Sequence, residues 1–231
     1  MDLKVPLYIR RYPSDVLARV AIVGALMAGA VAYVLYATRS KPESIEAALW
    51  FEEVTFSSNR LGEPLTPAEV ATIEDVARSE VLEAFRGLRL TLTQRHDAPY
   101  SLRVRQEVLD LRFKREVGVA GQSRGIAGFG GSGSVSFNFL ANGAMAWAPD
   151  DASRPELVAA IGRGIGRTAV HEFTHQILPT APIHSSRDGE SYEFASAARH
   201  AQYYGPIHWD FARPLLEQRL GSSMLSARTA R

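Results

Sequence analysis

His171 and His175 are the residues whose type and spacing most clearly indicate chemistry in this chain. Side chains four positions apart lie on the same face of a helix, so these two imidazoles can bind one metal ion. Glu172 lies roughly 100° further around the helix, which keeps its carboxylate off the metal but within reach of a water molecule bound there. A metal-dependent hydrolase requires this division between metal ligands and general base. The motif therefore predicts a zinc (Zn2+) site with Glu172 as the catalytic base.

The residues around this motif favour a buried helix. Thr168 stands three positions before the first histidine, Glu172 is the only charge within the motif, and apolar Ile177 follows the second histidine. The alternative is a surface helix with two solvated histidines. Buried paired histidines need a partner such as a metal ion. Because the chain has no cysteine, nitrogen and oxygen atoms must bind that metal.

One long helix is expected to carry the histidines. Ser153, Pro155 and Glu156 form a capping box that begins it, and Pro179 ends it after the second histidine. Apolar residues recur every four positions and should pack onto a sheet: Leu157, Ile161, Ile165, Ala169, Phe173 and Ile177. Glycines at 162, 164 and 166 each cost about 1 kcal/mol in a helix interior. Close approach of the helix backbone to a strand, or a kink, would offset that cost.

The residues before this helix predict strands and one further helix. Residues 49–57, 89–93 and 100–108 have strand patterns, and Thr66 with Glu69 forms a capping box at the start of a helix. A last amphipathic helix is expected before a glycine near the end of the chain.

The glycine-rich stretch 118–133 formally contains the GxGxxG pattern of dinucleotide sites. That pattern requires a following helix to bind a pyrophosphate, whereas residues 135–139 alternate like a strand. Asn142-Gly143 then predicts a tight turn into a second strand at 144–148. We therefore expect a flexible loop that leads into a β-hairpin.

Residues 20–37 carry no charge and approach the roughly 20 residues that a membrane-spanning helix needs. More basic residues precede this segment than follow it, so residues 1–19 are expected in the cytoplasm and the rest of the chain outside. The alternative is a cleaved signal peptide and a secreted protein. A linker at 38–47, one domain at 48–221 and a flexible tail at 222–231 complete the expected organisation. The net charge of +1 does not indicate nucleic acid as a partner.

The order of elements, with a strand, a helix, several strands and then the HExxH helix, resembles the catalytic domain of zinc-dependent metallopeptidases, above all the metzincin group. The resemblance covers roughly residues 48–184 and implies an α+β fold, a zinc ion and hydrolysis of peptide bonds. In that group the third ligand is a histidine six residues after the second, where this chain has Ala181. Pro179 and Pro182 replace the glycine turn of the group.

Two residues could supply the third ligand instead. His184 reaches the metal if the preceding loop bends back, and we favour it. Glu193 is the alternative, because it resembles the ligating glutamate on a second helix of thermolysin-like enzymes, although the aspartate expected four residues later is Ala197 here. Asp188 and Glu190 are weaker candidates.

Tyr192, Tyr203 and Tyr204 are candidates to donate a hydrogen bond to a developing oxyanion, with core packing as the alternative. Taken together, these features predict a membrane-anchored zinc metallopeptidase. Its substrate would be a peptide or protein that adds as a strand to the hairpin edge at residues 134–148. The alternative function is a non-catalytic, zinc-stabilised binding or structural module on the outer side of the membrane, with a closed site of four protein ligands.

Overall fold

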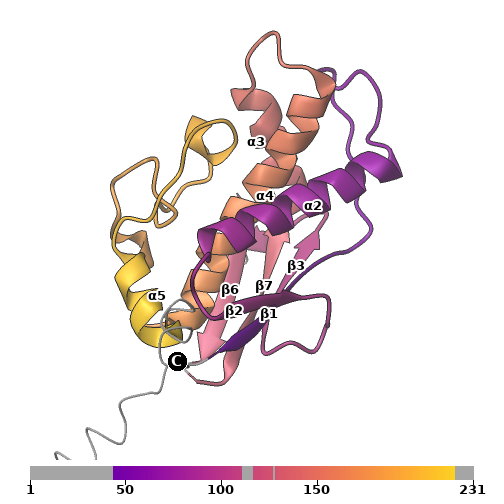
Figure 1. Cartoon of the computed structure of the whole chain (residues 1–231). Helices are drawn as coiled ribbons and strands as arrows, with labels where there is room; N and C mark the ends of the chain where they lie inside the picture. Colours follow the sequence, from indigo (N-terminus) through magenta and orange to yellow (C-terminus); the bar gives the residue numbers. More distant parts are fainter. Residues whose placement is uncertain (1–43, 111–116, 127, 222–231) are drawn as a thin grey trace, which may run out of the picture. The chain divides into compact units, whose positions relative to one another are not determined.

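The computed structural model describes residues 44–110, 117–126 and 128–221, in which a five-stranded sheet is packed against helices (Figure 1). Four strands run parallel, in the order β2 (Leu90–Thr93), β1 (Ile45–Phe51), β3 (Tyr100–Arg105) and β7 (Gly130–Ser136). The fifth strand, β6 (Gly121–Ile126), runs antiparallel to β7 at the edge of the sheet. This mixed architecture agrees with the expected α+β class.

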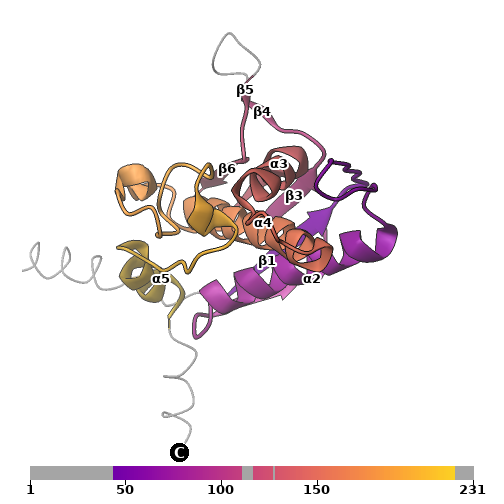
Figure 2. The ribbon, with the colours of Figure 1, turned by 90° about the horizontal axis from the view of Figure 1, so that it is seen from above.

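The helices of the described residues are α2 (Pro67–Ala84), α3 (Phe137–Trp147), α4 (Arg154–Ile177) and α5 (Ala212–Leu220). Short 3-10 turns, η1 (Ile183–Ser185) and η2 (His200–Gln202), follow α4. On β3, Tyr100, Leu102 and Val104 alternate with more exposed residues, so one face of the sheet forms the core. A separate ribbon of β4 (Leu109–Asp110) and β5 (Val117–Gly118) projects away from the helices (Figure 2).

Both predicted capping boxes are confirmed. The backbone N–H of Thr66 donates to the carboxylate of Glu69 at 2.8 Å, and that of Ser153 donates to Glu156 at 2.8 Å. Arg154 then joins the two helix starts, since its Nε lies 2.6 Å from Glu69 Oε1. Its hydrogen bond lowers the pKa of Glu69 to about 2. The start of α4 is therefore tied to the start of α2 by a charge-assisted contact.

Gly162 and Gly166 of α4 approach another helix, and Gly164 approaches Tyr203, so the prediction of close approach to a strand is wrong. A Cβ added at Gly162 would lie 2.9 Å from the carbonyl oxygen of Ile73, and one at Gly166 would lie 2.7 Å from that of Ala77. Both partners belong to α2. The glycines allow α2 and α4 to cross in direct backbone contact, which places α4 firmly on the core.

The prediction of a flexible loop at 118–133 is wrong, because much of this stretch forms the β6–β7 hairpin. Three of its glycines, Gly121, Gly125 and Gly131, face α4. A Cβ at Gly131 would lie 2.6 Å from Gln176 Cγ, and a Cβ at Gly121 would lie 2.8 Å from Glu172 Oε1. Glycine is needed on these strands because the helix lies directly on them.

The prediction of a hairpin at 134–148 is also wrong, because α3 occupies most of this stretch. The Ser136 hydroxyl accepts from the backbone N–H of Phe139 and caps the helix. The buried side chains follow the helical period: Phe137, Leu140, Ala141, Ala144 and Met145. Gly143 lies within α3, and Tyr203 packs directly against it. A Cβ at this position would lie 2.5 Å from Tyr203 Cζ, so only glycine leaves enough space for the ring. Tertiary packing, and not a turn, explains this glycine.

The domain begins earlier than expected. The strand expected at 49–57 is Ile45–Phe51, so it starts within the expected linker at 38–47. No helix of the described residues is long and apolar enough to cross a membrane. The expected membrane segment at 20–37 and the expected tail at 222–231 lie outside those residues.

Candidate metal centre

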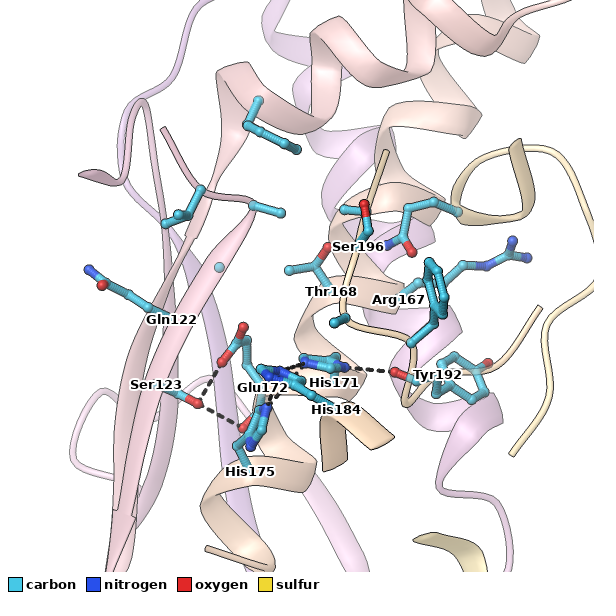
Figure 3. A pocket seen from close by; sticks show the side chains of 18 of the residues that line it. Gln122, Ser123, Arg167, Thr168, His171, Glu172, His175, His184, Tyr192 and Ser196 are labelled. Carbon is cyan, nitrogen blue, oxygen red and sulfur yellow. Dashed lines mark hydrogen bonds between the residues drawn. The ribbon is translucent and has the colours of Figure 1, made fainter. Parts of the chain in front are cut away.

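Three histidines meet at one end of α4. His171 and His175 come from the last turns of this helix, and His184 comes from η1, after the chain has turned back. The Nε2 atoms of His171 and His175 are 3.1 Å apart, and each lies 3.0 Å from Nε2 of His184 (Figure 3). The structure thus brings together the motif histidines and the favoured third ligand.

This triangle fits a zinc ion. Two nitrogen ligands at about 2.0–2.1 Å from a tetrahedral zinc are about 3.3 Å apart, close to the 3.0 and 3.1 Å found here. In the described part of the chain, His171, His175 and His184 form the group of three or more His, Asp or Glu side chains that lie close enough to bind one metal ion. If zinc binds here, the three histidines would leave its fourth tetrahedral position open, as in catalytic zinc sites.

The imidazoles of α4 are held in the neutral form that binds metals. Burial lowers the pKa of His171 to about 4. Burial, together with the positive charge of protonated neighbouring histidines, lowers the pKa of His175 to about 3. Both rings are therefore unprotonated at neutral pH.

The backbone of Tyr192 orients the first histidine. His171 Nδ1 lies 2.7 Å from the carbonyl oxygen of Tyr192. The Nδ1–H donates to this oxygen, so the lone pair is on Nε2, which faces the other histidines. The buried Tyr192 ring packs on Trp209, with ring centroids 4.7 Å apart. The segment after α4 thus fixes both the tautomer and the direction of His171.

Glu172 is buried next to β6 and lines the same pocket as the histidines. The Ser123 hydroxyl donates to Glu172 Oε2 at 2.7 Å and lies 3.0 Å from the Glu172 carbonyl oxygen. Figure 3 shows the Glu172 carboxylate near both Ser123 and the histidines. Gly121 leaves the space that this carboxylate occupies. The edge strand therefore orients the predicted base.

Ser123 and Gly121 escaped the sequence prediction because their stretch was expected to be a loop. Gly121, Ser123 and Gly125 alternate with larger residues, and that period of two was the available signal for a strand with a small-residue face.

A pocket of about 510 Å³ lies in front of the histidines. One wall is residues 118–123, which include the start of β6, and the opposite wall is the segment between Tyr192 and Gln202. Arg167 and Thr168, one helical turn before the first histidine, line it along α4. The pocket therefore extends from the metal centre along the helix and along the sheet edge.

Glu193 lies away from the histidine group. Its fully buried carboxylate accepts hydrogen bonds from the backbone N–H groups of Asp210, Phe211 and Ala212, at distances from 2.6 to 3.2 Å. Ser191 Oγ donates to the same carboxylate at 2.5 Å. A carboxylate at a helix N-terminus satisfies otherwise unpaired donors. Glu193 thus caps α5, and the alternative of Glu193 as third ligand does not fit this geometry.

The remaining candidates also lie outside the histidine group. Asp188 pairs with His208 at 2.8 Å, and Glu190 is exposed. The Tyr203 hydroxyl is buried at Gly143 and does not line the pocket, and the Tyr204 hydroxyl donates to a backbone carbonyl of α3. Of the three tyrosines considered for the oxyanion, Tyr192 lines the pocket.

Comparisons of the chain with protein-family models, with curated proteins and with solved structures give no match.

Proposed function

We propose that this chain is a zinc-dependent metallopeptidase. The single observation that supports this most is the triangle of His171, His175 and His184 with Glu172 beside it, next to a pocket of about 510 Å³. A zinc ion bound there would act as a Lewis acid, which lowers the pKa of water to about 7 and polarises a carbonyl group.

The chain's own residues supply the proton transfers of the proposed reaction. Glu172 accepts a proton from the attacking water and delivers it to the amine nitrogen that leaves when the peptide C–N bond breaks. Ser123 holds the carboxylate through its 2.7 Å hydrogen bond, so the base stays oriented toward the pocket. Tyr192 keeps His171 in the metal-binding tautomer through its carbonyl oxygen.

The exposed edge of β6 supports a peptide as substrate. In the described sheet β6 pairs with β7 alone, and its residues 121–123 line the pocket. The edge at 134–148 is not available, because β7 lies between β3 and β6 and is followed by α3. An extended peptide would instead add as a strand to β6, which supplies main-chain hydrogen bonds whatever the peptide sequence.

The non-catalytic module is the less supported alternative. A closed structural zinc site needs a fourth protein ligand, whereas the group in the described residues has the three histidines alone. The membrane anchor at residues 20–37 rests on the sequence, and we keep it as part of the proposal.

Substitution of the base tests this function directly. The full chain, purified in detergent and loaded with zinc, is incubated with a broad peptide library, and cleavage is read by mass spectrometry. Glu172→Gln should retain zinc and fold while cleavage falls by about a thousandfold or more. Glu190→Gln, which changes an exposed carboxylate outside the histidine group, is the matched control. Equal background cleavage by wild type and Glu172→Gln, with zinc present, would reject the peptidase.

A further inference from the structure

The pocket beside the histidines contains an arginine, Arg199, that forms no ion pair with a described carboxylate. Besides the histidines, the charged side chains among its described lining residues are Arg167, Glu172 and Arg199. Arg167 pairs with Glu80 at 3.1 Å, and Ser123 donates to Glu172. Arg199 forms no ion pair with any described residue, although it is only partly exposed.

The hydrogen bonds of Arg199 hold its guanidinium in place and leave donors for a ligand. Nη1 donates to the carbonyl oxygen of Gly189, and Nη2 donates to Gln202 Oε1 at 3.2 Å. The guanidinium also lies over the Phe194 ring, 5.1 Å from its centroid. An arginine has five N–H donors in a rigid fork, so a further donor is left on each terminal nitrogen.

The surroundings of Arg199 favour an anion. Burial, and then the like charge of Arg167, lower the pKa of Arg199 to about 10, although the charge of Asp188 acts in the opposite direction. By contrast, the hydrogen-bonded carboxylate of Glu69 raises the pKa of Arg154. A partly buried cation without a carboxylate in direct contact is costly, and a ligand carboxylate would offset that cost. Arg199 lines the same pocket as His171, so a ligand bound to Arg199 would lie near the histidines.

We propose that Arg199 forms a carboxylate-binding subsite in this pocket, so that the preferred peptides carry an acidic side chain or a free C-terminal carboxylate near the metal centre. The guanidinium fork matches a carboxylate in two parallel hydrogen bonds. This inference rests on the proposed function for the identity of the ligand as a peptide. The binding preference itself is measured without turnover.

The test uses the full chain with Glu172→Gln, loaded with zinc, to bind peptides without cleaving them. The probes are two peptide pools that differ only in having Glu or Gln at the same positions, each prepared with a free and with an amidated C-terminus. Retention of each peptide is quantified by mass spectrometry. We expect about tenfold to 100-fold stronger retention of one carboxylate form. The Glu/Gln ratio reports an acidic side chain, and the free/amidated ratio reports a terminal carboxylate.

Adding Arg199→Gln should bring that ratio close to one. Arg199→Met, which keeps an unbranched side chain over Phe194, serves the same purpose if the glutamine variant does not fold. The matched control is Arg163→Gln, which removes a half-buried arginine that donates to the Tyr203 carbonyl oxygen but does not line the pocket. It should leave the ratio unchanged. A merely structural role of Arg199 would weaken retention of all pools equally.

The inference is overturned if neither carboxylate form is preferred, if the preference survives removal of Arg199, or if no pool is retained at all. Its failure is distinct from failure of the proposed function. Wild-type cleavage without a carboxylate preference rejects the subsite alone. A preference that depends on Arg199, without any cleavage by the wild type, rejects the peptidase and keeps the subsite.

Discussion

Replacing Gly121 with alanine probes how β6 positions the proposed base. A Cβ there would lie 2.8 Å from Glu172 Oε1 and 2.8 Å from Thr168 Cγ2, where ordinary contact begins at 3.4 Å. The difference, 3.4 − 2.8, requires a movement of about 0.6 Å. Glu172 Oε1 is the far end of a flexible side chain, whereas Thr168 Cγ2 is attached to a β-branched carbon, so we expect the Glu172 side chain to move. The overpacking should also cost about 1–3 kcal/mol of unfolding free energy.

A displacement of this size matters because a catalytic group must be held within about 0.5 Å, and an error of 1 Å can cost about a hundredfold in rate. We therefore expect Gly121→Ala to lower kcat/KM for a cleaved library peptide by about tenfold to a hundredfold, while zinc content stays at the wild-type value. Gly189→Ala is the matched control, since nothing lies within 4 Å of its added Cβ and it does not line the pocket. Equal kcat/KM for the two variants, or loss of zinc from Gly121→Ala, would refute this account of how Glu172 is positioned.

Three further predictions concern stability and location. Glu193→Ala removes the acceptor of three backbone N–H groups at the start of α5. The free energy of unfolding, measured in urea, should therefore fall by about 2–4 kcal/mol, while the zinc stoichiometry stays unchanged. Loss of zinc from the folded variant would argue for a ligand role instead. Unfolded imidazoles titrate near 6.5, whereas burial lowers the folded pKa of His171 to about 4 and of His175 to about 3. The unfolded metal-free chain therefore gains more protons as the pH falls. Urea titrations in EDTA should show stability decreasing from pH 6.5 to about 4 through His171 and on to about 3 through His175. The loss should be at most about 1.4 kcal/mol per pH unit for each ring, and less where solvent screens His175; a flat profile would contradict this. Finally, the full chain should stay with membranes after alkaline washing if residues 20–37 span the bilayer, and a soluble form that begins near Tyr33 would show cleavage instead.

The helix that carries the motif could be predicted from the sequence because its determinants are local. Ser153 and Glu156 interact across three residues, and the spacing of His171 and His175 gives neighbouring rings on any helix. The relation between the proposed base and the proposed metal ligands is local for the same reason. The core stripe of α4 is likewise encoded by its repeat of four, which identifies the buried face without naming the surface that covers it.

Only the tertiary structure decided which distant residues meet this helix. Short-range patterns could not separate His184 from Glu193, because the choice depends on the path of the chain after α4 and on the unpaired N–H groups of α5, which Glu193 accepts. The same limit explains the mistaken loop at 118–133. Its glycines signal flexibility when considered alone, but they provide space for α4 in the packed domain, and this packing brings Ser123 against Glu172. Contacts between segments far apart in the chain leave no spacing rule in the sequence, whereas a helix turn does.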